Sequence, residues 1–144
     1  MRRSFMIAAL MIALPGCSNT ATANEPDQNT VPCDETTSNL AFSECWQQLA
    51  QDSKDEVQNA FKTILNAARL SDDSEGQGRA WLVPALEASQ RDWLQYATSH
   101  CEFEGKVARG GTGTRSLVAQ CQTRLNKRRV AELQARTNAI EELM

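Results

Sequence analysis

Five cysteines and one histidine are the residues of this chain whose side chains most readily do chemistry. A single histidine excludes any site that needs two imidazoles, including the HExxH motif of zinc proteases. No two cysteines form a CxxC pair, so neither a thioredoxin-like redox site nor a zinc site is expected. His100 has no nucleophile motif around it and is interpreted as a surface or helix-end residue. We therefore expect no enzyme activity, no metal and no cofactor.

The first residues of the chain have the pattern of an export signal. A short basic start precedes about ten apolar residues, which as a helix would span only about 15 Å, half the core of a bilayer. The run ends in the letters LPGC, which resemble a bacterial lipobox with Cys17 as its cysteine. Residues 1–16 are predicted to be a lipoprotein signal peptide and Cys17 the lipidated N-terminus. The alternative is an ordinary secretory signal with this cysteine inside or near it.

The residue after the lipobox and the net charge indicate where the protein acts. In proteobacterial lipoproteins a residue other than Asp after the cysteine, here Ser18, resembles an outer-membrane sorting signal. We expect an exported protein anchored to the outer membrane through its lipid and facing the periplasm. Removal of the signal leaves thirteen basic and eighteen acidic residues, a net charge of −5 in place of −3. An acidic chain is a poor phosphate binder, so no nucleic acid partner is expected.

The mature chain divides into a tether and one domain. Residues 17–37 are rich in Ser, Thr, Asn and Pro and are predicted to be a lipidated N-terminus with a flexible tether. In the chain of 144 residues, 41% are hydrophobic, which is enough for one modest core. That domain is expected at residues 38–144. Glycine and proline total only eleven residues, which disfavours an all-β fold.

Helical periodicity predicts three helices in this domain. The first covers 38–70 and is followed by a polar loop over 71–78. The second begins between residues 79 and 84 and frays near Gly105. The third begins near Arg115 and continues to the C-terminus. With short connections these elements predict an all-α, up-down-up three-helix bundle.

Several side chains are placed on buried or solvated faces by this pattern. The predicted buried stripes contain Leu86, Trp93, Leu94, Ala97 and Cys101 in the second helix and Leu117, Cys121, Leu125, Leu133 and Ile140 in the third. Gln90 or Asn66 is expected to offer the indole N–H of Trp93 a hydrogen-bond partner. The basic run 124–129 is interpreted as a solvated helix face. Its functional alternative is contact with an anionic envelope polymer.

The four remaining cysteines are expected to form two disulfides, since an exported protein lies in an oxidising compartment. Cys33, Cys45, Cys101 and Cys121 allow three connectivities. In an up-down-up bundle Cys45, Cys101 and Cys121 lie at one end, and this placement alone does not decide between the connectivities. We favour Cys33–Cys45 and Cys101–Cys121 because each closes a short local loop and would contribute about 2–3 kcal/mol.

A spaced set of residues extends from the first predicted helix to the third. Its members are Cys45, Leu65-Asn66, Gln90-x-x-Trp93-x-x-Tyr96, Cys101, Gly110-Gly111, Cys121, Arg129 and Leu133. This ordered set, covering about 38–135, resembles the LprI-type lysozyme inhibitor domain. The resemblance implies a small exported helical domain that binds and inhibits a c-type lysozyme. The alternative function is a structural or scaffolding lipoprotein that binds another protein or an anionic envelope polymer.

The predicted loop between the last two helices is the candidate inhibitor segment. It consists of Arg109, Gly110, Gly111, Thr112, Gly113, Thr114 and Arg115. A c-type lysozyme holds two acidic carboxyl groups in an open cleft, and Arg109 or Thr112 could enter it. Such lysozymes are generally basic, so an acidic inhibitor would be drawn to them. The alternative interpretation of the loop is a flexible connector.

Overall fold

The computed structural model describes residue 33 and residues 38–74, 80–111 and 113–144. Over these ranges the chain forms three α-helices and no strand, namely α1 (Asn39–Ser74), α2 (Leu82–Val107) and α3 (Thr114–Glu141). None of the helices searched is both long and apolar enough to span a bilayer. The signal peptide, the lipidation of Cys17 and almost all of the tether lie outside the described residues, and these predictions stay predictions.

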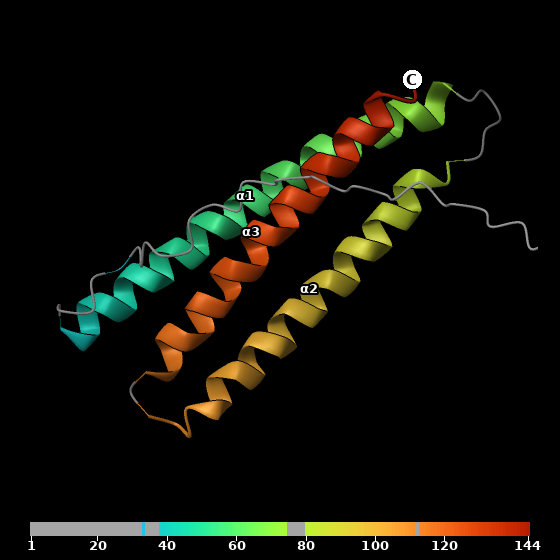
Figure 1. Ribbon diagram of the computed structural model, residues 1–144. Helices are drawn as coiled ribbons and strands as arrows, with labels where there is room; N and C mark the ends of the chain where they lie inside the picture. Colours follow the sequence, from blue (N-terminus) through green and yellow to red (C-terminus); the bar gives the residue numbers. More distant parts are fainter. Residues whose placement is uncertain (1–32, 34–37, 75–79, 112) are drawn as a thin grey trace, which may run out of the picture. The chain divides into compact units, whose positions relative to one another are not determined.

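The three helices form the expected up-down-up bundle (Figure 1). Helix α3 packs most extensively on α1, less on α2, and the smallest contact is the one between α1 and α2. Because α3 is the element that both other helices contact, side chains that tie the bundle together are expected on it. The limited contact between α1 and α2 leaves the flank of α2 that faces α1 partly uncovered.

The core consists of two clusters along the bundle. One joins α2 to α3 and contains Ala97, Cys101, Cys121 and Leu125; the other joins α1 to α3 and contains Val57, Ile64 and Leu133. The prediction of burial is wrong for two residues, since Leu94 is 48% exposed and Leu117 is 40% exposed. Leu94 follows the packed Trp93 by one residue, which rotates it toward the uncovered flank of α2.

Helix α1 continues through Ser74, so residues 71–74 are helical where a loop was predicted. The reason lies in Asp72, which is buried although it is charged. Its Oδ1 accepts hydrogen bonds from the backbone N–H groups of Trp81 at 3.3 Å and Leu82 at 3.1 Å, and its Oδ2 accepts one from Val83 at 3.1 Å. An acidic side chain from α1 therefore caps the N-terminus of α2, which has no side-chain cap of its own.

The carboxyl group of Asp72 has a perturbed pKa. Burial alone would raise the pKa, but the three backbone donors from Val83, Leu82 and Trp81 outweigh it, and the pKa lies below its ordinary value of 3.8. A carboxyl group whose pKa is lowered by folding stabilises the fold at pH values above its unfolded pKa. That contribution is lost as the pH falls below about 4, through the lowered pKa of the folded state.

The Asp72→Asn variant should therefore melt several degrees below the wild type at neutral pH, because it keeps an acceptor oxygen but loses the charge. The difference should shrink as the pH is lowered into the range where Asp72 itself becomes protonated. Thermal unfolding followed by circular dichroism between pH 2 and pH 7 would measure it. The exposed neighbour Asp73 supplies the control, and an Asp73→Asn variant with the same behaviour would contradict the assignment.

Two disulfides, Cys33–Cys45 and Cys101–Cys121, tie one end of the bundle, and this pairing confirms the favoured connectivity. At the same end α2 ends at Val107, close to the end predicted near Gly105. Gly105 is buried, and a Cβ atom there would lie 2.5 Å from Cγ2 of Val118. The glycine is thus required for α2 to approach α3 closely just before the connecting loop.

Candidate functional site

The candidate inhibitor loop joins α2 to α3 at the disulfide-tied end, and all of it except Thr112 lies in the described residues. Backbone hydrogen bonds close consecutive turns, from the N–H of Arg109 to the oxygen of Lys106 at 3.0 Å and from Gly111 to Ala108 at 3.2 Å. The described part of the loop is therefore a series of hydrogen-bonded turns.

Backbone conformation singles out Arg109 within this loop. Its φ is 52° and that of Gly110 is 76°, so two consecutive residues are left-handed. Glycine adopts this conformation freely, whereas for arginine it costs on the order of 1 kcal/mol or more. Arg109 and Arg115 are exposed, while Thr114 is half-buried and its Oγ1 donates to the oxygen of Gly111 at 2.8 Å. Within the described residues of the loop, Arg109 and Arg115 have no ion pair, and the hydroxyl of Thr114 is already bonded.

The base of the loop is held covalently. Cys101 lies in the last turns of α2 and Cys121 in the second turn of α3, and their Cα atoms are 5.5 Å apart. Both cysteines are fully buried in the cluster that joins the two helices. A loop on such a base loses little conformational entropy when it binds a partner.

A charged cluster lies on the side of α2 near this disulfide. Nε2 of His100 is 3.0 Å from Oε1 of Glu104, and Arg124 of α3 donates to both oxygens of the same carboxylate at 2.8 and 3.0 Å. The hydrogen bond from Arg124, aided by its charge and by His100, lowers the pKa of Glu104 although burial opposes it. His100 also stacks on Tyr96.

These contacts place His100 in a helix-to-helix ion network, half-buried, rather than at a free surface. The sulfur of Cys121 lies within 4.8 Å of the same nitrogen and carboxylate, which is a spacing that suits metal ligands. That sulfur is bonded to Cys101, however, so it has no thiolate to offer a metal. The cluster is therefore interpreted as a tie between α2 and α3.

Arg129, one of the residues that carry the family resemblance, was predicted on a solvated helix face but has a structural role. Its side chain is only 11% exposed, and its guanidinium lies 5.5 Å from the centre of the Trp93 ring. Its Nε donates to Oε1 of Gln90 at 3.1 Å, and a nitrogen is 3.2 Å from Oε2 of Glu132. The hydrogen bond predicted between Gln90 and the indole of Trp93 is not formed among the described residues, where the amide oxygen of Gln90 accepts from Arg129. The other expected partner, Asn66, is exposed.

The basic run 124–129 is a solvated face, as predicted, at Arg124, Lys127 and Arg128, which are exposed, but not at Arg129. A signal for this exception was present in the sequence. Arg129 lies four residues from Leu125 and four from Leu133, both buried, so the helical repeat places it on the core face of α3. The pairing of Arg124 with Glu104 also leaves less positive charge on this face for an anionic polymer.

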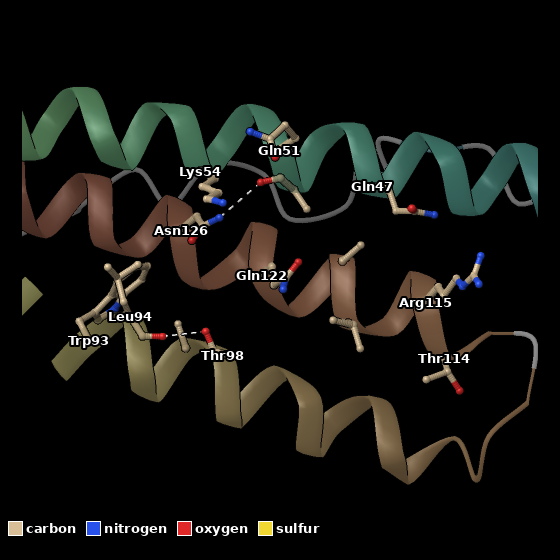
Figure 2. Close-up of a pocket in the computed structure, with 14 residues that line it drawn as sticks. Gln47, Gln51, Lys54, Trp93, Leu94, Thr98, Thr114, Arg115, Gln122 and Asn126 are labelled. Carbon is tan, nitrogen blue, oxygen red and sulfur yellow. Dashed lines mark hydrogen bonds between the residues drawn. The ribbon is translucent and has the colours of Figure 1, made fainter. Parts of the chain in front are cut away.

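A groove of about 540 Å³ lies between the three helices at the disulfide-tied half of the bundle (Figure 2). Its lining contains Gln47, Ala50, Gln51 and Lys54 from α1, Trp93, Leu94, Ala97 and Thr98 from α2, and Thr114, Arg115, Val118, Ala119, Gln122 and Asn126 from α3. At its base Asn126 donates to Oγ of Ser53 at 3.0 Å and links α3 to α1. Sequence reasoning did not predict this groove.

The described residues thus build a small, disulfide-tied helical domain with an exposed loop and a groove that polar and apolar side chains line together. The family model described as lysozyme inhibitor LprI matches residues 33–133, and the chain belongs to this family. An uncharacterized protein of Rhizobium meliloti (strain 1021) is 30% identical over 120 residues, which cover 81% of this chain and 84% of the relative. No solved structure matches the chain.

Proposed function

We propose that this domain inhibits a c-type lysozyme and that the loop at 109–115 is the part that enters the enzyme. Membership of the lysozyme inhibitor LprI family is the observation that carries the proposal. The geometry of the loop supports it, because an exposed arginine in a left-handed turn belongs to a loop whose two flanking helices are joined by a buried disulfide. Strained, exposed residues on a rigid base are typical of sites that bind a partner.

Charge explains how the two proteins would meet and hold each other. A basic lysozyme and an acidic inhibitor attract each other over the range of the Debye length, about 8 Å at physiological salt. Inside the cleft, the guanidinium of Arg109 would form a charge-assisted hydrogen bond with one of the two catalytic carboxylates. A carboxylate held in this way can neither donate a proton to the sugar bond nor stabilise the charge that develops there. The inhibitor itself needs no catalytic group.

Titration of a c-type lysozyme with the oxidised mature chain would test the proposal. Calorimetry at moderate salt should show binding, and the rate of cell-wall lysis should fall in proportion to the complex formed. Measurement at several salt concentrations should show weaker binding as salt rises. A folded chain with no effect on lysis would remove this enzyme as a target and would leave the scaffolding function as the better proposal.

We also propose that the domain acts at a membrane, anchored through lipid on Cys17. The proposal is supported by the LPGC sequence that ends the apolar run. In cells, the wild type should sediment with membranes, and Cys17→Ser should either appear in the soluble fraction or keep its signal peptide, because it lacks the sulfur that is acylated. Ser18→Ala is the matched control and should stay with membranes. Equal sedimentation and processing of Cys17→Ser would contradict the anchor.

A further inference from the structure

We propose that the groove between the three helices binds an extended acidic peptide, at a site whose lining does not include Arg109. Two cations, Lys54 of α1 and Arg115 of α3, line the groove, and none of the described residues that line it is acidic. Neither cation has an ion pair among the described residues, whereas Arg124 and Arg129 of α3 do. In a chain with a net charge of −3 this local excess of positive charge favours an anionic ligand.

The two cations are placed at opposite ends of the groove (Figure 2). Asn126 bonds to Ser53, so Lys54 lies at the level of Asn126 along the bundle. Arg115 precedes Asn126 by eleven helical residues, which is about 16 Å along the axis at a rise of 1.5 Å per residue. An extended chain advances about 3.4 Å per residue, so carboxylates on the first and fifth residues of a peptide would reach both cations.

Between the cations the groove offers acceptors at the spacing of a peptide backbone. The amide nitrogen of Gln47 donates to Ser43, and that of Gln51 donates to Asp55, which leaves both side-chain oxygens to accept. These two glutamines are one helical turn apart, about 6 Å along α1. In an extended peptide, N–H groups on one edge repeat every second residue, about 6.8 Å. Gln122, half-buried on α3, can both donate and accept.

The same observations disfavour a sugar chain as the occupant. Sugar rings bind best against a free aromatic face, and Trp93 is the only aromatic residue among the described residues that line the groove. One face of its ring is covered by the guanidinium of Arg129, and the ring packs against both core clusters. The groove therefore supplies two cations, hydrogen-bonding amides and apolar side chains such as Leu94 and Val118, but no free aromatic face. This combination matches an acidic peptide with small apolar residues better than an acidic glycan.

The test uses two synthetic peptides, acetyl-EAGAE-amide and its neutral counterpart acetyl-QAGAQ-amide, and the oxidised mature chain labelled with nitrogen-15. The acidic peptide should bind at least tenfold more tightly than the neutral one and should shift the side-chain amide signals of Gln47, Gln51 and Gln122. Lys54→Gln should weaken binding at least fivefold. Lys62→Gln, an exposed lysine on α1 outside the groove, should bind like the wild type.

Three results would overturn the proposal: no binding of the acidic peptide, equal binding of both peptides, or equal loss in the Lys54→Gln and Lys62→Gln variants. An oligomer of three galacturonate residues serves as a second probe. If it binds through Lys54 while the peptide does not, the groove takes acidic glycans and the peptide assignment is wrong. No lysozyme is present in these measurements, so their outcome is independent of the proposed inhibition.

Discussion

Replacing Arg109 with alanine should weaken inhibition of a c-type lysozyme at least tenfold, equivalent to about 1.4 kcal/mol or more. Arg109 is exposed at the start of the loop, directly after the C-cap of α2, and its loss removes the group proposed to bind a carboxylate in the cleft. At a φ of 52° the left-handed conformation costs alanine as much free energy as it costs arginine. The free energy of unfolding should therefore change by less than about 0.5 kcal/mol. Inhibition constants from a lysis assay and a thermal melt of each variant measure both effects.

A matched control separates this contact from a general effect of charge. Arg128→Ala removes an exposed arginine from the middle of α3 and makes the chain more acidic by the same amount. A more acidic chain should meet a basic enzyme slightly faster, so Arg128→Ala should inhibit at least as well as the wild type. Equal inhibition by the wild type and Arg109→Ala would exclude Arg109 as the energetic centre of the complex.

Removing the Cys101–Cys121 disulfide, by changing both cysteines to alanine, should lower the free energy of unfolding by about 3 kcal/mol. The bridge closes a segment with a sequence separation of 20. Without the bridge the unfolded chain has more conformational entropy, which favours unfolding. Alanine is preferred to serine because both sites are buried in an apolar cluster, where a hydroxyl group would lack a partner. Urea unfolding measures the change, which is a large part of the roughly 5–15 kcal/mol that small domains have.

The other disulfide gives the comparison that links stability to function. Changing Cys33 and Cys45 to alanine opens a segment with a separation of 12 and should cost a similar amount. That bridge does not hold the base of the 109–115 loop. Inhibition by folded protein should therefore weaken more in the Cys101–Cys121 variant. Equal inhibition by the two variants would show that the loop needs no covalent base.

The helices could be predicted from the periodicity within each one, and the disulfide pairing from the shortness of the segments that the bridges close. Apolar residues at three- and four-residue steps located the three helices, and the bridged cysteines are 12 and 20 residues apart along the chain. The residues that were misplaced depend on how one helix packs against another. The helical position of Asp72 depends on amide groups of α2, nine to eleven residues away along the chain.

The same reason explains what was missed at the candidate sites. Whether Leu94 is covered depends on how far α2 lies from α1, and no periodicity within α2 reports that distance. The groove arises from this same separation. The buried position of Arg129 could have been predicted, because its spacing from two buried leucines is visible in the sequence. The basic residues around it favoured the interpretation as a solvated face instead. The amide acceptors of Gln47 and Gln51 gave no local signal, since glutamines on a helix surface are common.

Both disulfides lie at one end of the bundle, so the two ends should differ in how readily they unfold locally. At the other end α1 and α2 are joined through the Asp72 cap and by packing, which are non-covalent contacts. Partial unfolding follows the weakest contacts, so amide hydrogens near the start of α2 should exchange with solvent through openings that leave residues 101–121 folded. Local unfolding should therefore occur mainly at the end of the bundle that holds the Asp72 cap. The end proposed to bind a partner should stay folded during these openings.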